Sequence, residues 1–229
     1  MRAGVARGGI ISPVLFSLYV NDMPSPSRHV ELALYADDTA VIATFRQPEM
    51  LVGYLDPYIS DLERWLSKWR IAINDSKSSA MLFAKTVRRI PKPRAVQLFG
   101  EPIQWVDDAR YLGVTLDKGL NWSKHIDQVR KKAAQRLGTL GPLLNRSGLS
   151  IRNVVLLRKQ LIRLMMYYSC PIWRSAARSN IKKLQVLQSK CLRIATNAPW
   201  YVGNRQIHDD LGVPYFSDHI RSLRDLTRS

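Results

Sequence analysis

Two short segments rich in β-branched and aromatic residues flank a pair of acids near the start of the chain. They are residues 30–35, with the sequence VELALY, and residues 39–43, with the sequence TAVIA. Apolar runs of this length, joined by a few polar residues, are typical of an antiparallel hairpin. The pattern therefore predicts a hairpin that carries Asp37 and Asp38 at its tip.

Five other stretches predict helices. Ser12-Pro13 is a good cap and first helical residue for a buried helix over residues 13–20. Residues 48–69 have apolar positions at intervals of three and four, and Pro57 should kink this helix or start it afresh. Three later helices, the second capped by Ser150, carry apolar residues at Trp122, Ile126, Val129, Ala133, Leu137 and Leu140; at Val154, Leu157, Leu161, Leu164 and Tyr168; and at Ile181, Leu184, Leu187, Cys191 and Ile194.

Short strands are predicted between these two groups of helices. Their apolar runs are interrupted by turn residues, with Gly100-Glu101 as one tight connection. The order of elements predicts an α+β fold in two parts, with helices packed on a small antiparallel sheet over residues 1–117 and helices alone over residues 118–229. The predicted strands cover residues 71–73, 79–84, 96–99, 102–105 and 111–116.

Positive charge is concentrated in the second part. The chain has 229 residues, of which 46% are hydrophobic, so it can bury a core in one domain or two small ones. Its net charge is +17, but residues 1–117 hold 14 Lys and Arg against 13 Asp and Glu, whereas residues 118–229 hold 21 against 5. A one-sided field of this size attracts polyanions, most commonly nucleic acid. A solvated basic surface and an acidic protein partner are the alternatives.

Several classes of protein are excluded. Cys170 and Cys191 are too few for a disulfide framework, do not resemble metal ligands, and favour an intracellular protein with reduced thiols. The uncharged run over residues 8–21 is short for a membrane span and is followed by no small-residue cleavage site. We therefore expect a protein of the nucleus or cytoplasm with no signal peptide, membrane segment or membrane partner.

The acid pair is the candidate for catalysis. Adjacent aspartates repel each other, so a cation or several hydrogen-bond donors usually face such a pair. Magnesium binds carboxylate oxygens and bridges to substrate phosphates, which suits nucleotidyl transfer. A polar turn is the alternative, because Asp is a common turn residue.

Several ordered motifs resemble the reverse transcriptases of non-LTR (LINE-type, jockey-like) retrotransposons, particularly those of insects. The resemblance covers essentially the whole chain, and five ordered blocks are far more specific than the acid pair alone. The motifs are Gly4-Val5-Ala6-Arg7-Gly8-Gly9-Ile10-Ile11-Ser12-Pro13-Val14-Leu15-Phe16, Tyr19-Val20-Asn21-Asp22-Met23-Pro24, Tyr35-Ala36-Asp37-Asp38, Asn74-Asp75-Ser76-Lys77-Ser78, Tyr111-Leu112-Gly113-Val114 and the tail Gln188-Ser189-Lys190-Cys191-Leu192-Arg193.

The resemblance implies catalytic roles for three residues. Asp37 and Asp38 match palm carboxylates that hold two Mg²⁺ ions, which activate the primer 3′-hydroxyl and neutralise the triphosphate. Lys77 matches a proposed proton donor to departing pyrophosphate, with a plain surface lysine as the alternative. The family's third metal carboxylate and its fingers lie upstream of residue 1. We therefore expect this fragment alone to be inactive.

The resemblance also implies binding residues. The loop and helix start beside the incoming nucleotide and template match Arg7, Gly8, Gly9, Ser12 and Pro13. The family usually has Gln where this chain has Arg7, and arginine cannot accept hydrogen bonds as an amide does. The primer-grip region matches Tyr111, Leu112 and Gly113, although a buried hairpin would use the same residues.

The implied function is that of a C-terminal palm-and-thumb fragment of an RNA-directed DNA polymerase. Its partners would be an RNA template, a DNA primer and deoxynucleoside triphosphates. The alternatives are a non-catalytic nucleic-acid-binding remnant of a retrotransposon and, more weakly, a basic interaction protein that meets no nucleic acid. The predicted contacts to the nucleic-acid backbone come from three helices: Arg130, Lys131, Lys132 and Arg136; Arg152, Arg158, Lys159 and Arg163; and Lys182, Lys183, Lys190 and Arg193.

Overall fold

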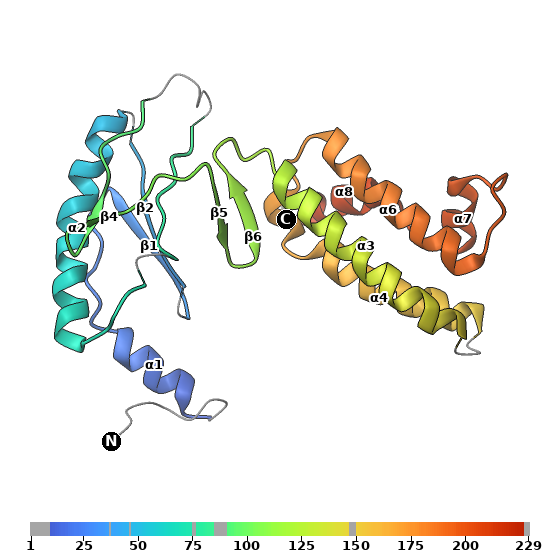
Figure 1. Cartoon of the computed structure of the whole chain (residues 1–229), viewed down its shortest axis with the longest axis horizontal. Coiled ribbons are helices and arrows are strands. Elements are labelled where there is room, and N and C mark those ends of the chain that lie inside the picture. Colours follow the sequence, from blue (N-terminus) through green and yellow to red (C-terminus); the bar gives the residue numbers. More distant parts are fainter. Residues whose placement is uncertain are drawn as a thin grey trace. The chain divides into compact units, whose positions relative to one another are not determined.

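The structure is a computed structural model of the chain, and it describes residues 10–36, 38–45, 47–74, 77–84, 91–146 and 150–226. The chain divides into two units, Met1–Asp107 and Asp108–Ser229. Helices and small antiparallel sheets occur together, which confirms the α+β class (Figure 1). The sequence places the boundary after residue 117, whereas residues 108–117 are grouped with the later helices, because Val114 belongs to their core.

The described residues of the first unit form two helices and four strands. Helix α2 is close to the β1–β2 hairpin and to β3 (Figure 1). In order, the elements are α1 (Ser12–Val20), β1 (Val30–Tyr35), β2 (Asp38–Ala43), α2 (Pro48–Trp69), β3 (Gln97–Leu98) and β4 (Glu101–Pro102).

The predicted hairpin is confirmed in its two strands; of the two acids predicted at its tip, Asp38 is the first residue of β2 and Asp37 lies outside the described residues. Strands β1 and β2 pair antiparallel, with Val30 opposite Ala43 and Tyr35 opposite Asp38. Ala36 begins the turn between them with φ of 49°. Only Val30 is buried among the described strand residues, so the hairpin contributes little to a core.

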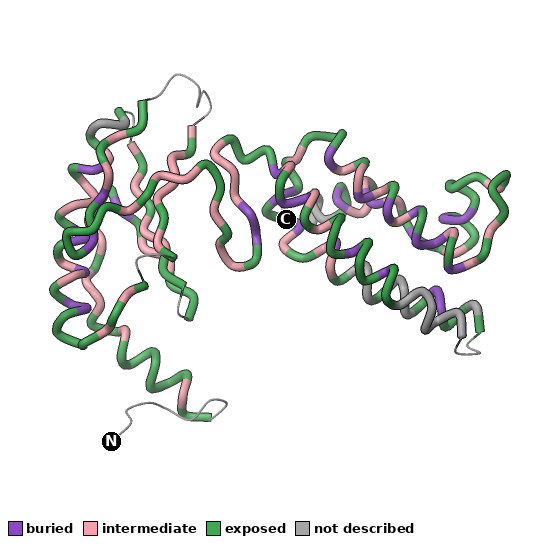
Figure 2. Tube along the Cα trace, viewed as in Figure 1, coloured by how far each residue is buried: buried purple, intermediate pink, exposed green. Residues whose placement is uncertain are grey.

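Helix α1 has the predicted extent, but the prediction that it is buried is wrong. Figure 2 shows it exposed along nearly its whole length, and none of its residues is buried. Its sequence is apolar almost throughout, so packing against one neighbour would leave the other sides in solvent. The helix begins one residue earlier than predicted: Ile11 is the N-cap, without a side-chain hydrogen bond, and Ser12 is already helical.

Helix α2 is confirmed and runs without interruption through Pro57, so it does not start afresh there. Its apolar stripe supplies two small clusters. Val52 and Ile59 pack with Val96 and Leu98, and farther along the helix a second cluster is formed by Leu62, Trp65 and Leu66.

The strands predicted after α2 are mostly shorter or absent. No strand covers residues 71–73, and residues 79–84 contribute a single bridge between Ala80 and Trp105. The strands predicted over residues 96–99 and 102–105 correspond to the two-residue strands β3 and β4. Their turn is Phe99-Gly100 rather than Gly100-Glu101, because Phe99 and Gly100 are the residues with positive φ, 51° and 82°.

The second unit begins with a hairpin and continues with helices. The single strand predicted over residues 111–116 is wrong, because a turn at Leu112-Gly113 splits it into two paired strands. The three predicted helices are confirmed, and three shorter ones were not predicted. The elements are β5 (Asp108–Tyr111), β6 (Val114–Asp117), α3 (Ser123–Arg146), α4 (Ile151–Tyr167), α5 (Cys170–Trp173), α6 (Arg178–Thr196), α7 (Asn204–Asp210) and α8 (Phe216–Leu226).

The second unit has one large core. Trp173 is fully buried, stacks on Phe216 with 6.1 Å between ring centroids, and donates from its indole N–H to the Tyr168 carbonyl at 2.9 Å. Buried positions recur along α3 and α6 (Figure 2). Cys170 and Cys191 are buried in this core without a disulfide between them, and burial raises the pKa of the Cys170 thiol to about 11. That thiol therefore stays protonated near neutral pH.

Two polar side chains hold segments of this unit in place through hydrogen bonds. The Asp117 carboxylate accepts backbone N–H bonds from Gly119 at 3.2 Å, Asn121 at 3.0 Å and Trp122 at 2.7 Å, which shapes the loop into α3. His208 is almost fully buried: its Nδ1 donates to the Val213 carbonyl at 2.9 Å, and its Nε2 accepts from the Ser189 hydroxyl at 3.1 Å. In the described parts of the chain, no helix has the length and apolar character needed to cross a bilayer.

Candidate active site and nucleic-acid interface

The hairpin tip is the candidate active site. Asp38 is the first residue of β2 and is exposed, and Tyr35, opposite it, is also exposed. Asp37 lies outside the described residues. Because β1 ends at Tyr35 and β2 begins at Asp38, Asp38 lies at the turn end of this two-stranded sheet.

Asp38 suits a hard divalent ion in its chemistry, since carboxylate oxygens are the ligands that Mg²⁺ prefers. Among the residues that the structure describes, no group of three acidic, histidine or cysteine side chains is arranged to hold a metal. The described part of the site thus supplies one carboxylate, and the sequence adds a second beside it.

The other predicted catalytic and nucleotide-binding residues are only partly described. Lys77 is exposed, and its backbone N–H donates to the Asn74 carbonyl at 3.0 Å. Ser12 and Pro13 form the first turn of α1. The remaining predicted positions, Arg7, Gly8 and Gly9, lie outside the described residues.

Asp22 has a role that was not predicted. Its Oδ1 accepts from the indole N–H groups of Trp65, at 2.7 Å, and Trp69, at 3.0 Å. Lys68 lies 3.3 Å from Oδ2. These contacts, led by the Trp65 hydrogen bond, lower the pKa of Asp22 below its ordinary value of 3.8. The carboxylate therefore fastens the segment after α1 to the last turns of α2.

The predicted primer-grip residues form the turn of the β5–β6 hairpin. Leu112 and Gly113 both have positive φ, 45° and 78°. The hydroxyl of Tyr168 donates to the Leu112 carbonyl at 2.9 Å, and a Cβ at Gly113 would come within 3.1 Å of the Tyr168 ring. The turn is therefore packed against the residue that ends α4, and Gly113 is required by both its φ and this close approach.

Most predicted backbone-binding cations with described side chains are exposed on α3 and α6. Lys182, Val186 and Lys190 follow one another at intervals of four, so they share one side of α6. Arg152 at the start of α4 is also exposed, but the side chains of Arg158, Lys159 and Arg163 lie outside the described ones. We call six exposed cations the basic helix surface: Arg130, Lys131, Lys132 and Arg136 of α3, with Lys182 and Lys190 of α6.

Two of the predicted cations have partners within the fold. The Lys183 ammonium lies 2.9 Å from Asp127 Oδ1 and joins α6 to α3. The Arg193 guanidinium donates to two carbonyl oxygens in the loop after α6 and to Asn204 Oδ1 at the start of α7. We leave both out of the basic helix surface because their side chains are half-buried, whereas its six members are exposed, including Arg130, which lies 3.8 Å from Asp127.

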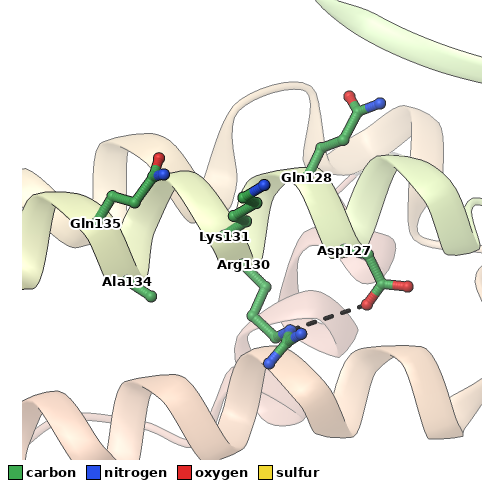
Figure 3. A pocket seen from close by; sticks show the side chains of 6 residues that line it. All are labelled: Asp127, Gln128, Arg130, Lys131, Ala134 and Gln135. Carbon is green, nitrogen blue, oxygen red and sulfur yellow. Dashed lines mark ion pairs between the residues drawn. The ribbon is translucent and has the colours of Figure 1, made fainter.

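A shallow pocket lies along the exposed side of α3. Figure 3 shows Arg130 directed toward Asp127, 3.8 Å away, while Gln128 and Gln135 point to the other side of the helix. Lys131 also lines it. Amide and cationic groups of this kind are donors for phosphate oxygens, so the lining fits a nucleic-acid backbone.

The sequence comparisons identify the family. Residues 1–116, just over half of the chain, match the family model for reverse transcriptase (RNA-dependent DNA polymerase). The chain belongs to the reverse transcriptase family. This confirms the resemblance that the ordered motifs indicated.

Similar reverse transcriptases come from insect mobile elements. The chain is 32% identical, over 97% of its length, to the RNA-directed DNA polymerase from mobile element jockey of Drosophila funebris, of which it covers 25%. It is 34% identical, over 96% of its length, to the probable RNA-directed DNA polymerase from transposon X-element of Drosophila melanogaster, of which it covers 24%. The chain thus spans about a quarter of the length of these relatives. No solved structure matches it.

Proposed function

We propose that this chain is part of an RNA-directed DNA polymerase of a non-LTR retrotransposon. The observation that carries the proposal is the similarity to the jockey and X-element polymerases over nearly the whole chain, including the acid-tipped hairpin. In this proposal the first unit is part of the palm and the second is the thumb. The substrates are deoxynucleoside triphosphates, an RNA template and a DNA primer.

The hairpin acids hold the metal in this proposal. Reverse transcriptases depend on divalent metal ions, and Asp37 and Asp38 would hold Mg²⁺ through their carboxylate oxygens. The bound ions supply charge that activates the primer hydroxyl and neutralises the triphosphate. Lys77 would deliver a proton to the departing pyrophosphate, and its exposed position leaves it accessible for this role.

The basic helix surface holds the template-primer in this proposal. Its side chains are long, flexible and exposed, which suits contacts to phosphates rather than to base edges. Binding should therefore tolerate any sequence, and a preference for a hybrid duplex would come from its A-like shape. The same contacts would serve a non-catalytic nucleic-acid-binding remnant, so binding and catalysis need separate tests.

Salt dependence tests the binding. If about six phosphates are neutralised, the logarithm of the association constant should fall with the logarithm of salt concentration at a slope near −5. Fluorescence anisotropy of the full chain with a labelled RNA–DNA hybrid measures this slope. Lys131→Ala should flatten it by about one. Arg64→Ala, which removes an exposed cation of α2, should leave it unchanged.

Primer extension on a homopolymer RNA template with Mg²⁺ tests the catalysis. We expect no synthesis by residues 1–229 alone, because two adjacent carboxylates supply few oxygens for two ions. The same assay is applied to a version extended upstream through the third family carboxylate. In that version Asp37→Asn should abolish synthesis and leave hybrid binding intact. Robust synthesis by the present chain would contradict the expectation that it is inactive alone, and near-normal synthesis by the Asp37→Asn variant would contradict the metal assignment.

A further inference from the structure

The loop between α6 and α7 presents two large aromatic side chains to solvent. Trp200 is 89% exposed and Tyr201 is 72% exposed. Their ring centroids are 6.0 Å apart, with 80° between the ring planes. An exposed tryptophan of this kind covers no core and adds little to the apolar burial that stabilises the fold, so its ring is accessible to a ligand.

The loop is held in one shape by Arg193. Its guanidinium donates to the carbonyls of Pro199 and Val202, both at 2.6 Å, and to Asn204 Oδ1 at 2.9 Å. The Val202 N–H also donates to the Pro199 carbonyl at 3.2 Å, which closes a four-residue turn. Trp200 and Tyr201 are the two central residues of that turn.

The residues on each side of the turn are anchored by apolar contacts. Ala198 and Val202 pack against the cluster of Leu192, Ile207 and Val213. The backbone that carries the two rings is therefore fixed before any ligand arrives, and a ligand would not have to order it. Preorganisation of this kind raises affinity because less conformational entropy is lost on binding.

The surroundings of the rings favour a polyanion. Arg205 at the start of α7 is exposed, and the Arg193 guanidinium donates to the carbonyls of the turn itself. The exposed acids on α7, Asp209 and Asp210, lie at its other end. Flat aromatic faces beside cations are typical of sites where single-stranded nucleic acid stacks its bases.

We propose that Trp200 and Tyr201 form a stacking site for unpaired bases of the bound nucleic acid. The proposal rests on the nucleic-acid binding proposed above and adds a preference for a single-stranded segment over a blunt duplex. Because the ring planes are nearly perpendicular, a strand must turn between the two rings or stack on one of them. Base identity should matter little, since every base has a π-face.

The test compares two ligands with the full chain. One is a blunt RNA–DNA hybrid and the other is the same hybrid with a single-stranded RNA overhang, both followed by fluorescence anisotropy. Wild type should bind the overhang ligand more tightly. Trp200→Ala should weaken overhang binding at least about fivefold, leave blunt-hybrid binding unchanged, and leave the salt slope unchanged. Trp200→Phe should retain most of the overhang preference.

Val186→Ala is the matched control. Val186 is an exposed apolar residue on the same side of α6 as Lys182 and Lys190, but it offers no aromatic face. The Val186→Ala variant should bind both ligands as wild type does. The role of Tyr201 in stacking is tested with Tyr201→Ala, and Tyr201→Phe is the conservative variant.

The outcomes separate the two proposals. If both alanine variants bind the overhang ligand like wild type while hybrid binding remains salt-dependent, the stacking site is overturned and the basic helix surface stands. If wild type binds neither ligand at low salt, the nucleic-acid proposal falls and the stacking site falls with it. Equal weakening of both ligands by Trp200→Ala would also overturn the stacking assignment, because a blunt duplex offers few unpaired bases.

Discussion

The two units bury their apolar side chains in different ways. The second unit gathers thirteen buried residues from β6, the loop before α3 and five helices into one large cluster, and it forms two further clusters of three. In the first unit, seven of the described buried residues form two clusters of four and three that include α2, while α1 and much of the β1–β2 hairpin stay exposed. The comparison indicates that the second unit has the larger core and that the acid-bearing hairpin of the first unit rests on a thin one.

The largest expected effect is Trp173→Ala in the second unit. Truncation removes a fully buried indole and its stacking on Phe216, which should cost about 3 to 5 kcal/mol of unfolding free energy. Hydrogen exchange read separately over the two units should show increased exchange throughout the second unit and little change in the first.

Val52→Ala is the matched change in the first unit, since Val52 is 1% exposed. Its cluster is small, so the loss should stay local to α2 and β3. If both substitutions increased hydrogen exchange equally in the two units, the contrast between one large core and two small ones would be contradicted.

A smaller effect is expected from Asp117→Ala. The change leaves the N–H groups of Gly119, Asn121 and Trp122 without their carboxylate acceptor and should cost about 2 kcal/mol, measured by urea unfolding of the second unit. Asp117→Asn keeps one acceptor oxygen and should cost less. A result below about 0.5 kcal/mol for Asp117→Ala would mean that water replaces the carboxylate.

The long elements were predictable because local spacing determines them. The apolar periodicity located α2, α3, α4 and α6, and the Ser150 cap is confirmed by its bond from the Asn153 N–H. The short strands were not predictable, because their turns depend on positive φ at Phe99 and Leu112. Neither phenylalanine nor leucine indicates a positive φ from the sequence. Helices α5 and α7 have few turns, so their periodicity is weak, whereas α8, with eleven residues, is amphipathic and could have been predicted.

The candidate site was predictable in part for the same reason. The exposed cations of α3 follow from the helical period, but the sequence did not show that Lys183 and Arg193 have internal partners, because these lie on other elements. Asp22 was missed because Trp65 is 43 residues away. A signal for Trp200 and Tyr201 does exist, since Pro199 and Gly203 frame them as a turn.

A pH effect on the second unit should come from His125. Burial, and secondarily the charge of Lys132, lower the pKa of His125 below its ordinary value of 6.5, and its Nδ1 accepts the Thr115 N–H at 3.2 Å. The folded state therefore holds His125 neutral, whereas the unfolded chain protonates it below about pH 6.5. The unfolding free energy should be highest above pH 6.5 and fall as the pH is lowered from there. His125→Asn keeps an acceptor and should flatten this dependence.

The smallest effect is expected at Asp22 in the first unit, and it should occur in a different pH range. Its pKa is lowered below 3.8, so its contribution to stability is complete above that value and is lost as the pH falls toward the folded pKa. Protonation should weaken the indole contacts of Trp65 and Trp69, which tryptophan emission between pH 5 and pH 2 would detect. Asp22→Asn should remove this transition while leaving the His125 transition in place. If Asp22→Asn instead altered the His125 transition below pH 6.5, the two units would not respond to acid independently. The contrast between their cores would then not extend to their electrostatics.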